Sequence, residues 1–495
     1  MLLSELLRNV EEKRIAGFRD VDVSGLAYDS RLLEPGQAFF CIKGLVTDGH
    51  LYASDAVSGG ASVLFAEREP EGDVGREVVV VTVPDTRRTL AACSVRFFGE
   101  PSSEMKLVGV TGTNGKTTTA FLTESVLGEA GFATSLVGTV EMHIRGKVEP
   151  VTRTTPESLD LQRLFRRMVD SGVEVAVMEV SSHALELHRV DCCEFDVVVF
   201  TNLTQDHLDF HISLEEYFAA KRRLFEEGEF GRGRTALVNI DDRFGKTLFQ
   251  ETSLPRRSFG IDSLADVRAT DVEVLPSGNR FNLCYGGEEI AVKTLLQGRF
   301  NVYNCLGAAA VAIEQGIGPE SIAGGLAGLA GVPGRFENID CGQPFTALVD
   351  YAHTPDGIRN LLEACRDVTG GRVIIVVGCG GDRDQSKRPL MGRVGTELSD
   401  LCVITSDNPR GEDPEAIIEM ILEGVSGRFP PDRYTVEVDR REAIARAVGM
   451  ARPGDLLVVA GKGHESGQIF ADRVIPFDDR EVLREALREV TGEER

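Results

Sequence analysis

The sequence has little positive charge for its length. Its 495 residues include 54 Lys and Arg against 78 Asp and Glu, which gives a formal net charge of -24. A chain this acidic is repelled by the backbone of nucleic acids and by anionic membranes, so bulk binding to either is excluded. A small anionic ligand held by a few placed cations is still compatible with this balance.

Long apolar runs are also missing. The first residues, MLLSELLRNVEEKR, already carry Glu5 and Arg8, so they lack the apolar stretch of a signal peptide and predict an amphipathic helix instead. The longest nearly apolar stretch, residues 305–313, is too short to span a bilayer. We therefore expect a cytoplasmic protein without membrane insertion.

Cysteine pairs with metal-binding spacing are absent as well. The 10 cysteines lie between Cys41 and Cys402, and none of them forms a CxxC or Cys/His pattern typical of zinc sites. We interpret them as reduced thiols in the core of a cytosolic protein. The sequence also has no internal repeats and no low-complexity tract.

What the sequence does contain is a series of short apolar runs that end in clusters of small polar residues. Examples are KLVGV before TGTNGKTT, VEVAVMEV before SSH, and RVIIVVG before CGGDRD. Such runs, alternating with helical stretches, predict an α/β fold with mostly parallel strands buried on both faces. Ligands bind these sheets at the carboxyl ends of the strands, so the polar clusters are the candidate site.

The apolar runs group into two series, at residues 106–240 and 347–460, and an earlier section has strand candidates of its own. Alternating residues and turns between 266 and 293 predict antiparallel hairpins attached to the first series. A length of 495 residues predicts two to four domains. Linker-like segments at GEPSSE and GLAGVPGR divide the chain into residues 1–104, 105–332 and 333–495.

The sharpest motif is GVTGTNGKTT, which follows a predicted strand and precedes a predicted helix. Backbone N–H groups of such a glycine-rich loop wrap phosphate, a lysine reaches the outer phosphates, and a threonine can hold magnesium. The motif departs from GxxxxGK[ST] because Val110 stands five residues before Gly115; a plain glycine turn capping a helix is the alternative. The candidate phosphate-binding residues are Gly112, Thr113, Asn114, Gly115, Lys116, Thr117 and Thr118.

Two further strand ends carry candidate magnesium ligands. Glu179 ends VEVAVMEV, and Asp206, His207, Asp209 and His211 follow DVVVFTNL. A carboxylate beside a phosphate cradle is placed to coordinate Mg²⁺, which prefers oxygen ligands. A histidine near two acids is more often a hydrogen-bond partner, and only the shared sheet edge favours His207 as a ligand.

Taken together, these motifs resemble the Mur ligases of peptidoglycan synthesis. GVTGTNGKTT, TTPE, EVSSHAL, NLTQDHLDFH, GRFNVYN, DYAHTPD and GDRDQSKRP occur in the order found in that family, and DNPR and GKGHE point to its diaminopimelate-adding members. The resemblance implies an N-terminal domain that binds UDP, a central P-loop ATPase, and a C-terminal Rossmann-like domain that binds the amino acid.

The resemblance also implies roles for individual residues. Ser30 would contact the uridine nucleotide, and the muramoyl-dipeptide portion would be held by Thr154, Thr155, Ser181 and Arg189. Further contacts to ATP would come from Asn301, Arg335 and Asp350. Lys221 matches a lysine that is carbamylated in this family; the carbamate would offer Mg²⁺ an anionic oxygen in place of a repelling ammonium. Without the resemblance, Lys221 reads as an ordinary surface lysine.

The C-terminal motifs carry the amino-acid specificity. Diaminopimelate ends in an ammonium and a carboxylate, whereas lysine ends in an ammonium only. Arg383 and Arg410 can meet the carboxylate with charge-assisted bonds, while Asp407 and Glu465 can accept from the ammonium. The remaining predicted contacts are Asn408, the turn residue Pro409, and the carbonyl of Gly461.

The resulting hypothesis is a monomeric ligase that uses ATP and Mg²⁺ to join meso-diaminopimelate to UDP-MurNAc-L-Ala-D-Glu. The predicted catalytic residues are Lys116, Glu179, His207 and carbamylated Lys221; Thr117 and Glu179 would hold one metal ion, His207 and Lys221 the other. A lysine-adding ligase or a folylpolyglutamate synthetase is the near alternative. A regulatory P-loop NTPase is the distant one.

Overall fold

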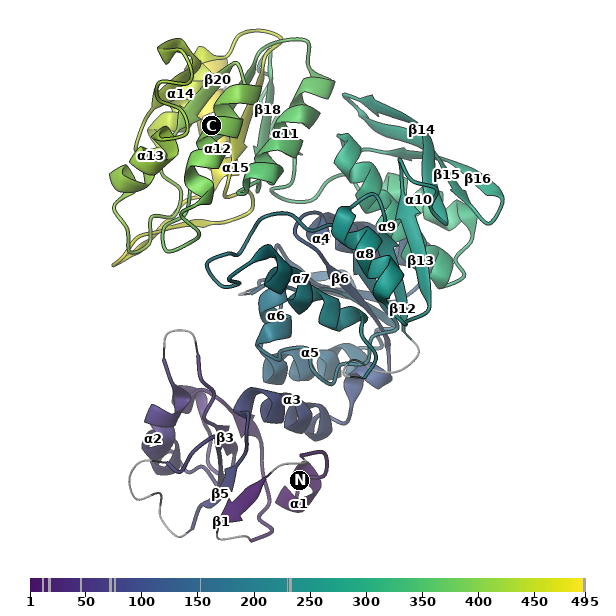
Figure 1. Cartoon of the computed structure of the whole chain (residues 1–495), viewed down its shortest axis with the longest axis vertical. Helices are drawn as coiled ribbons and strands as arrows, with labels where there is room; N and C mark the ends of the chain where they lie inside the picture. Colours follow the sequence, from purple (N-terminus) through teal and green to yellow (C-terminus); the bar gives the residue numbers. More distant parts are fainter. Residues whose placement is uncertain are drawn as a thin grey trace.

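The computed structural model describes residues 1–10, 13–16, 19–44, 47–70, 74, 77–151, 153–228, 230 and 234–492. Within these residues, three large sheets lie in three lobes that follow one another along the long axis of the molecule (Figure 1). The N-terminal lobe is purple, the middle lobe teal, and the C-terminal lobe green to yellow. The expected α/β class with mostly parallel sheets is confirmed; the domain boundaries at residues 104 and 332 stay predictions.

The N-terminal sheet has the strand order β1-β5-β4-β3-β2, and its strands run parallel except for β1. Its strands are β1 (Arg14–Ala16), β2 (Leu26–Ala27), β3 (Ala38–Phe40), β4 (Val63–Ala66) and β5 (Val79–Thr82). Its helices are α1 (Leu3–Leu6), α2 (Ala53–Ser58) and α3 (Thr86–Phe97).

The first helix is shorter than the sequence predicts. Leu3, Leu6, Leu7 and Val10 are all buried in the core of this lobe, yet the helix ends at Leu6. Lys13 folds back and donates to the carbonyls of Leu7 and Val10, which satisfies acceptors that a continued helix would have used itself. The prediction of an amphipathic helix over the whole N-terminal segment is therefore wrong, and residues 11–12 of that segment lie outside the described residues.

The middle sheet has the order β16-β15-β14-β13-β12-β11-β6-β10-β7-β8-β9. From β14 to β7 its neighbours are parallel, and antiparallel pairs extend it at both edges. This confirms the predicted hairpins at residues 266–293; the hairpin of β8 and β9 was not predicted. The strands are β6 (Lys106–Thr111), β7 (Thr134–Val137), β8 (Met142–Ile144), β9 (Lys147–Glu149), β10 (Val175–Glu179), β11 (Val197–Phe200), β12 (Thr235–Asn239), β13 (Arg256–Gly260), β14 (Val267–Leu275), β15 (Gly278–Tyr285) and β16 (Glu288–Thr294).

Helices cover both faces of this sheet. Helix α9 buries its apolar residues against α4 and the strands, in one large hydrophobic cluster. Helices α5 and α7 pack on a second cluster that also contains Phe165 and Phe225. The helices of the lobe are α4 (Lys116–Glu129), α5 (Ser158–Asp170), α6 (Ser182–Glu186), α7 (Leu214–Arg222), α8 (Arg243–Glu251), α9 (Arg299–Glu314) and α10 (Pro319–Gly328).

The C-terminal sheet has the order β17-β18-β22-β19-β20-β21, with only β17 antiparallel among the described strands. Its strands, with the small hairpin β23–β24, are β17 (Glu337–Asn338), β18 (Thr346–Asp350), β19 (Val373–Val377), β20 (Leu401–Ile404), β21 (Tyr434–Val436), β22 (Leu456–Ala460), β23 (Gly467–Ile469) and β24 (Val474–Pro476). Its helices are α11 (Pro355–Val368), α12 (Lys387–Leu398), α13 (Pro414–Leu422), α14 (Arg440–Met450) and α15 (Asp479–Thr491).

Strand register brings the polar clusters together. In the middle sheet Glu179 pairs with Val110, and Phe200 pairs with Thr111, so the loops after β6, β10 and β11 start side by side. In the C-terminal sheet Asp350 pairs with Ala460, and Val377 pairs with Ile404. The segments GDRD, DNPR and GKGHE thus leave neighbouring strand ends. In the part of the chain described above, no helix combines the length and apolar character needed to cross a bilayer.

Candidate active site

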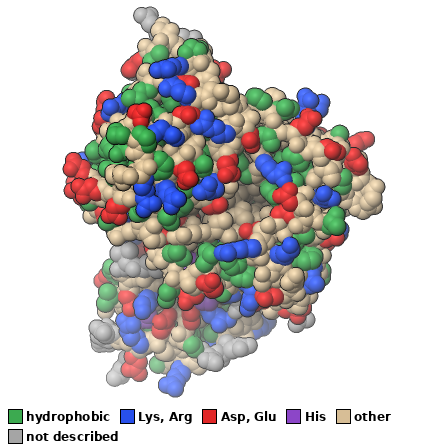
Figure 2. All heavy atoms as spheres, turned by 45° about the horizontal axis from the view of Figure 1, so that its top comes forward, with side chains coloured by type: hydrophobic (Ala, Val, Ile, Leu, Met, Phe, Trp, Pro, Cys, Tyr) green, Lys and Arg blue, Asp and Glu red, His purple; other side chains and the backbone are tan. Residues whose placement is uncertain are grey.

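A cavity of about 730 Å³ opens between the middle and C-terminal lobes. It lies at the carboxyl ends of β6, β10 and β11, and the start of the C-terminal lobe closes it from the other side. In the space-filling view the molecule is hollowed near its centre, with basic and acidic side chains around the hollow (Figure 2). Most of the sequence-predicted residues for ATP and for the dipeptide line this cavity.

The loop between β6 and α4 needs its glycines. Gly112 and Gly115 have φ angles of 147° and 84°, where side chains are strained. An added Cβ would lie 1.9 Å from Thr201 Oγ1 at Gly112 and 2.4 Å from Asn304 Oδ1 at Gly115. The backbone N–H groups of Thr113 and Asn114 donate to the carbonyl and side-chain oxygens of Asn202, both at 2.9 Å. The glycine angles and these hydrogen bonds therefore hold the loop in one conformation before the N-terminus of α4, where a phosphate-binding loop has to lie.

Lys116 turns its ammonium back over this loop. Its Nζ donates to the carbonyls of Gly112 at 3.0 Å and Thr113 at 2.8 Å. Burial lowers the pKa of Lys116, and the nearby Glu179 carboxylate opposes that change. The ammonium lies where a phosphate held by the loop would become its partner.

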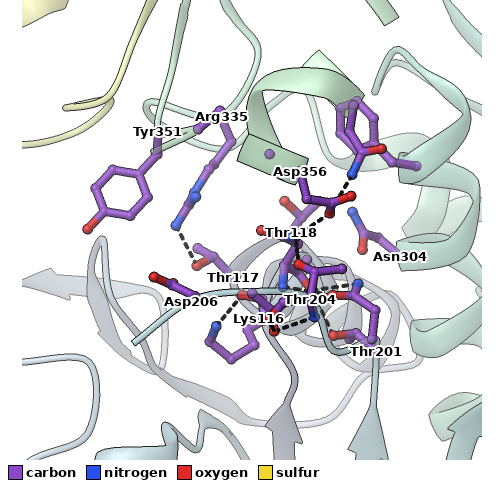
Figure 3. A pocket seen from close by; sticks show the side chains of 18 of the residues that line it. Lys116, Thr117, Thr118, Thr201, Thr204, Asp206, Asn304, Arg335, Tyr351 and Asp356 are labelled. Carbon is purple, nitrogen blue, oxygen red and sulfur yellow. Dashed lines mark hydrogen bonds between the residues drawn. The ribbon is translucent and has the colours of Figure 1, made fainter. Parts of the chain in front are cut away.

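Carboxylate and hydroxyl oxygen atoms lie close to one another beside Lys116. Thr117 Oγ1 donates to Glu179 Oε2 at 3.0 Å, and Thr139 donates to the same carboxylate through its backbone N–H and its hydroxyl. Arg335 reaches across from the C-terminal lobe, and its Nη2 lies 3.2 Å from Thr117 Oγ1 (Figure 3). A buried carboxylate and a hydroxyl in contact are the donor set that Mg²⁺ prefers, so Thr117 and Glu179 fit this ion.

Lys221 is buried at the bottom of the same site rather than on the surface. Its Nζ donates to the carbonyl of Gly112 at 2.8 Å and lies 4.6 Å from the centre of the Tyr217 ring. Burial holds the pKa of Lys221 well below its usual range, and the Lys116 ammonium lowers it further. A lowered pKa favours the neutral amine, which is the form that reacts with CO₂.

His207 lies among aromatic rings next to this lysine. Its ring centre is 4.9 Å from that of His183 and 5.9 Å from that of Tyr217. Burial lowers the pKa of His207 to about 3, so its imidazole is neutral at pH 7 and keeps a lone pair for a metal ion. Within the described residues, no group of three or more His, Cys, Asp and Glu side chains is arranged to hold a metal ion.

Other residues of the cavity come from the C-terminal lobe and from α9. Asp350 accepts from the backbone N–H groups of Phe336 and Ala352, both at 2.7 Å, and burial raises its pKa. Asn301 Oδ1 accepts from Asn304 at 2.8 Å on α9. Both predicted ATP contacts therefore line the cavity, together with Arg335 and Thr118.

The sequence reasoning missed Asp356. Its Oδ2 accepts from Asn114 Nδ2 at 3.1 Å, so it joins the C-terminal lobe to the phosphate loop across 242 residues of sequence. It stands at the start of α11, whose first turn is capped by Thr354. The segment HTPD, a capping threonine followed by proline and an acid, is the signal that could have marked this helix end.

The residues predicted to hold the dipeptide form a second group in the cavity. Thr155 Oγ1 donates to the Glu179 carbonyl at 2.9 Å, and the hydroxyl oxygens of Thr154 and Thr139 lie 3.1 Å apart. Ser181 caps α6, and Arg189 Nη2 lies 2.9 Å from Glu157. Ser30, in contrast, lies in a short 3₁₀ helix of the N-terminal lobe (Ser30–Leu32), away from the cavity lining.

The residues predicted to hold diaminopimelate lie on the three neighbouring C-terminal loops. Arg383 lines the cavity, 3.6 Å from Asp209 of the middle lobe. Arg410 has a φ of 50° and donates to the Gly381 carbonyl at 2.9 Å.

The other five of these residues pack closely against one another or against neighbouring loops. Asn408 Nδ2 donates to Glu465 Oε2 at 2.7 Å, and a Cβ on Gly461 would lie 2.6 Å from Asp407. A Cβ on Gly381 would likewise lie 1.9 Å from the carbonyl oxygen of Pro409. The described lining of the cavity includes Arg383 but not these partners, which lie on the loops beside it.

The family comparisons cover most of the chain. Residues 110–312 match the Mur ligase middle domain, residues 334–463 match the Mur ligase glutamate ligase domain, and residues 22–97 match the Mur ligase family catalytic domain. The cavity lies between the first two of these matched regions.

Individual relatives match over the full length. The UDP-N-acetylmuramoyl-L-alanyl-D-glutamate–2,6-diaminopimelate ligase of Syntrophomonas wolfei is 46% identical over 488 residues, which cover 99% of each chain. A solved structure of a ligase with that name covers 100% of both chains, with a TM-score of 0.67 and 29% identity. The MurF ligase of Thermotoga maritima, solved with ADP, shares the fold with a TM-score of 0.65 at 19% identity. The chain belongs to the Mur ligase family.

Proposed function

We propose that this protein is an ATP-dependent ligase that joins meso-diaminopimelate to the D-glutamyl γ-carboxylate of UDP-MurNAc-L-Ala-D-Glu, a step of peptidoglycan precursor synthesis. The observation that carries the proposal is one cavity between two sheets, where the phosphate cradle of the middle sheet faces Arg335, Asp350 and Arg383 of the C-terminal lobe. The monomeric state and the cytoplasmic location stay predictions.

The chemistry requires activation of the carboxylate, because hydroxide is a poor leaving group. A γ-carboxylate oxygen attacks the γ-phosphorus of ATP, the bond to ADP breaks, and an acyl phosphate forms. The amine nitrogen then attacks the acyl carbon and loses a proton, and phosphate leaves with the oxygen that came from the carboxylate. No covalent bond to the enzyme is needed.

Side chains of the cradle supply charge and position for the first step. Lys116 and Arg335 are the cations next to Thr117, and they would balance negative charge that builds up on the transferred phosphoryl group. Thr117 and Glu179 would hold one Mg²⁺, and His207 with carbamylated Lys221 would hold a second. Bound there, Mg²⁺ would neutralise phosphate charge and orient the γ-phosphate for attack.

The carboxylate substrate would enter from the side of Thr155, Ser181 and Arg189. Arg189 is held by Glu157, a buried carboxylate that also lies 3.0 Å from Arg87 and 2.8 Å from Arg153. Three guanidinium groups around one carboxylate leave a local excess of positive charge in a chain whose net charge is -24. This excess suits the anionic dipeptide portion of the substrate.

Specificity for the amino acid would rest on charge matching at the C-terminal loops. Arg383 and Arg410 can pair with the distal carboxylate of diaminopimelate, and Asp407 and Glu465 can accept from its ammonium. Lysine lacks that carboxylate, so it would offer these arginines no charged partner. A site built to pair a substrate group discriminates against an analogue that lacks the group, so we expect lysine to be a poor substrate.

Amino-acid-dependent phosphate release tests the proposed function. With ATP, Mg²⁺ and UDP-MurNAc-L-Ala-D-Glu, we expect release with meso-diaminopimelate to exceed release with L-lysine at least a hundredfold, and only trace release without an amine. Equal rates with lysine would assign the chain to the lysine-adding ligases, and use of a folate with glutamate would assign it to the folylpolyglutamate synthetases. Phosphate release without any amine would identify a regulatory NTPase.

A further inference from the structure

The GKGHE segment contains a buried cation that none of the roles above uses. The side chain of Lys462 is fully buried, and it lies between the DNPR loop and the strand β23. Its Nζ contacts Asn408 Oδ1 at 2.9 Å, Glu465 Oε2 at 2.9 Å and the Gly467 carbonyl at 2.7 Å. An ammonium has three N–H donors, so all of them are used here.

These contacts fix the orientation of the Asn408 amide. Its Oδ1 faces two groups that can only donate, the Lys462 ammonium and the backbone N–H of Ile469 at 3.0 Å. Its Nδ2 therefore points to Glu465, to which it donates at 2.7 Å. With Lys462 removed, the only remaining donor to Asn408 Oδ1 in the described structure is the Ile469 N–H.

The same contacts use only one of the two oxygens of the Glu465 carboxylate. Oε2 accepts from both Lys462 and Asn408, whereas no hydrogen bond or ion pair to Oε1 is found in the described ranges. The Glu465 side chain is 31% exposed, so its second oxygen can meet a ligand. Lys462 thus holds one edge of the carboxylate inward and leaves the other edge free.

The backbone of the two loops is held separately. Arg440 forms a fully buried ion pair with Asp479, and it donates to the carbonyls of Ser406 at 3.3 Å and Ala460 at 3.0 Å. Although burial opposes the shift, Arg440 and Lys462 together keep the pKa of Asp407 below its usual range. Arg440 therefore fixes where the loops run, and Lys462 fixes how their side chains point.

We propose that Lys462 is a positioning residue for amino-acid selection, which orients Glu465 toward the ammonium group of the incoming amino acid and leaves the second N–H of Asn408 to its carboxylate. This inference rests on the proposed function. Lys462 does not touch the substrate itself; it acts through the two side chains that do. Its removal should weaken binding of the amino acid and leave binding of ATP, which lies at the other loops, nearly unchanged.

The test compares apparent KM values in the ligation assay. Lys462→Met keeps the length of the side chain and removes the ammonium, and we expect it to raise the KM for diaminopimelate at least tenfold and the KM for ATP less than twofold. Lys462→Gln, whose amide can still donate, is expected to raise the KM for diaminopimelate by a smaller factor. Arg372→Met is the matched control, because Arg372 pairs with Asp455 and the Met450 carbonyl at the opposite end of the same sheet.

A double variant separates positioning from general damage. In a Glu465→Gln background, the effect of Lys462→Met on the KM for diaminopimelate should shrink at least threefold, because the carboxylate that it orients is already neutral. This double variant also neutralises the carboxylate that Lys462→Met leaves without its cation, so it keeps the test usable if Lys462→Met alone does not fold. Equal rises in both KM values, or an undiminished effect in the Glu465→Gln background, would overturn the inference.

These outcomes are distinct from failure of the proposed function. If the wild-type protein does not join diaminopimelate to the UDP-MurNAc-dipeptide, the proposed function fails. If it does, and the Lys462 variants shift both KM values alike, only the positioning role fails.

Discussion

Replacing Lys116 with Met is expected to lower kcat about a thousandfold, the range found when a preorganised charge is removed from a transition state. The ammonium lies over the phosphate loop, 3.0 Å and 2.8 Å from the carbonyl oxygens of Gly112 and Thr113, and no other lysine of the described residues donates to both. The substitution keeps the apolar stem, so the buried packing around it is retained. Steady-state ligation rates at saturating substrate measure the effect.

Lys106→Met is the control for this substitution. Lys106 starts the same strand, β6, but it is exposed at the far end and donates to Gln315. Its replacement should change kcat less than twofold. A kcat for Lys116→Met within tenfold of the wild type would remove Lys116 from the phosphoryl-transfer step.

Replacing Lys221 with Ala is expected to lower kcat at least a hundredfold, and millimolar acetate or propionate is expected to restore part of it. The physical reason is that the buried amine has a lowered pKa, so its neutral form can add CO₂ and become a carboxylate ligand for Mg²⁺. A small carboxylate can fill the space that the alanine leaves. The rate is measured with and without the added acid.

Two control experiments accompany this prediction. Lys246→Ala, at an exposed position on α8, should leave the rate unchanged and show no response to acetate. Wild-type protein prepared without CO₂ should lose activity that bicarbonate restores. If CO₂ depletion changes nothing and acetate rescues nothing, Lys221 acts as an unmodified lysine.

The phosphate cradle was predictable because its signals are local. Gly112, Gly115 and Lys116 stand within five residues, directly between a strand and a helix, and the backbone angles of the glycines follow from that turn. Strand ends were equally visible, since an apolar run followed by a polar cluster marks them. The polar clusters after these strands lie close together because neighbouring parallel strands end at the same edge of the sheet.

The missed residues make contacts across long sequence separations. Asp356 meets Asn114 from 242 residues away, and Lys462 meets Asn408 from 54 residues away. A lysine in GKGHE looks the same in sequence whether its ammonium points to solvent or into a buried network. Only packing decides between these, as it also decided that Lys221 is buried rather than exposed.

The net charge of the sequence likewise does not reveal which charged side chains lie together in the fold. The acidic balance excluded nucleic acid, but it could not show that Arg87, Arg153 and Arg189 gather around one carboxylate, because they come from separate segments of the chain. Local excess of positive charge in an acidic protein is a property of the fold. It is this local charge that suits the anionic substrates.

The most direct measurement follows oxygen from the substrate to the released phosphate. UDP-MurNAc-L-Ala-D-Glu labelled with ¹⁸O in its γ-carboxylate is incubated with ATP and diaminopimelate, and the phosphate is analysed by mass spectrometry. An acyl-phosphate route predicts one ¹⁸O atom in each phosphate and the matching loss of one label from the ligated product. Phosphate without label, formed at the same rate as ADP, would mean that water attacks ATP directly and would contradict ligation through an acyl phosphate.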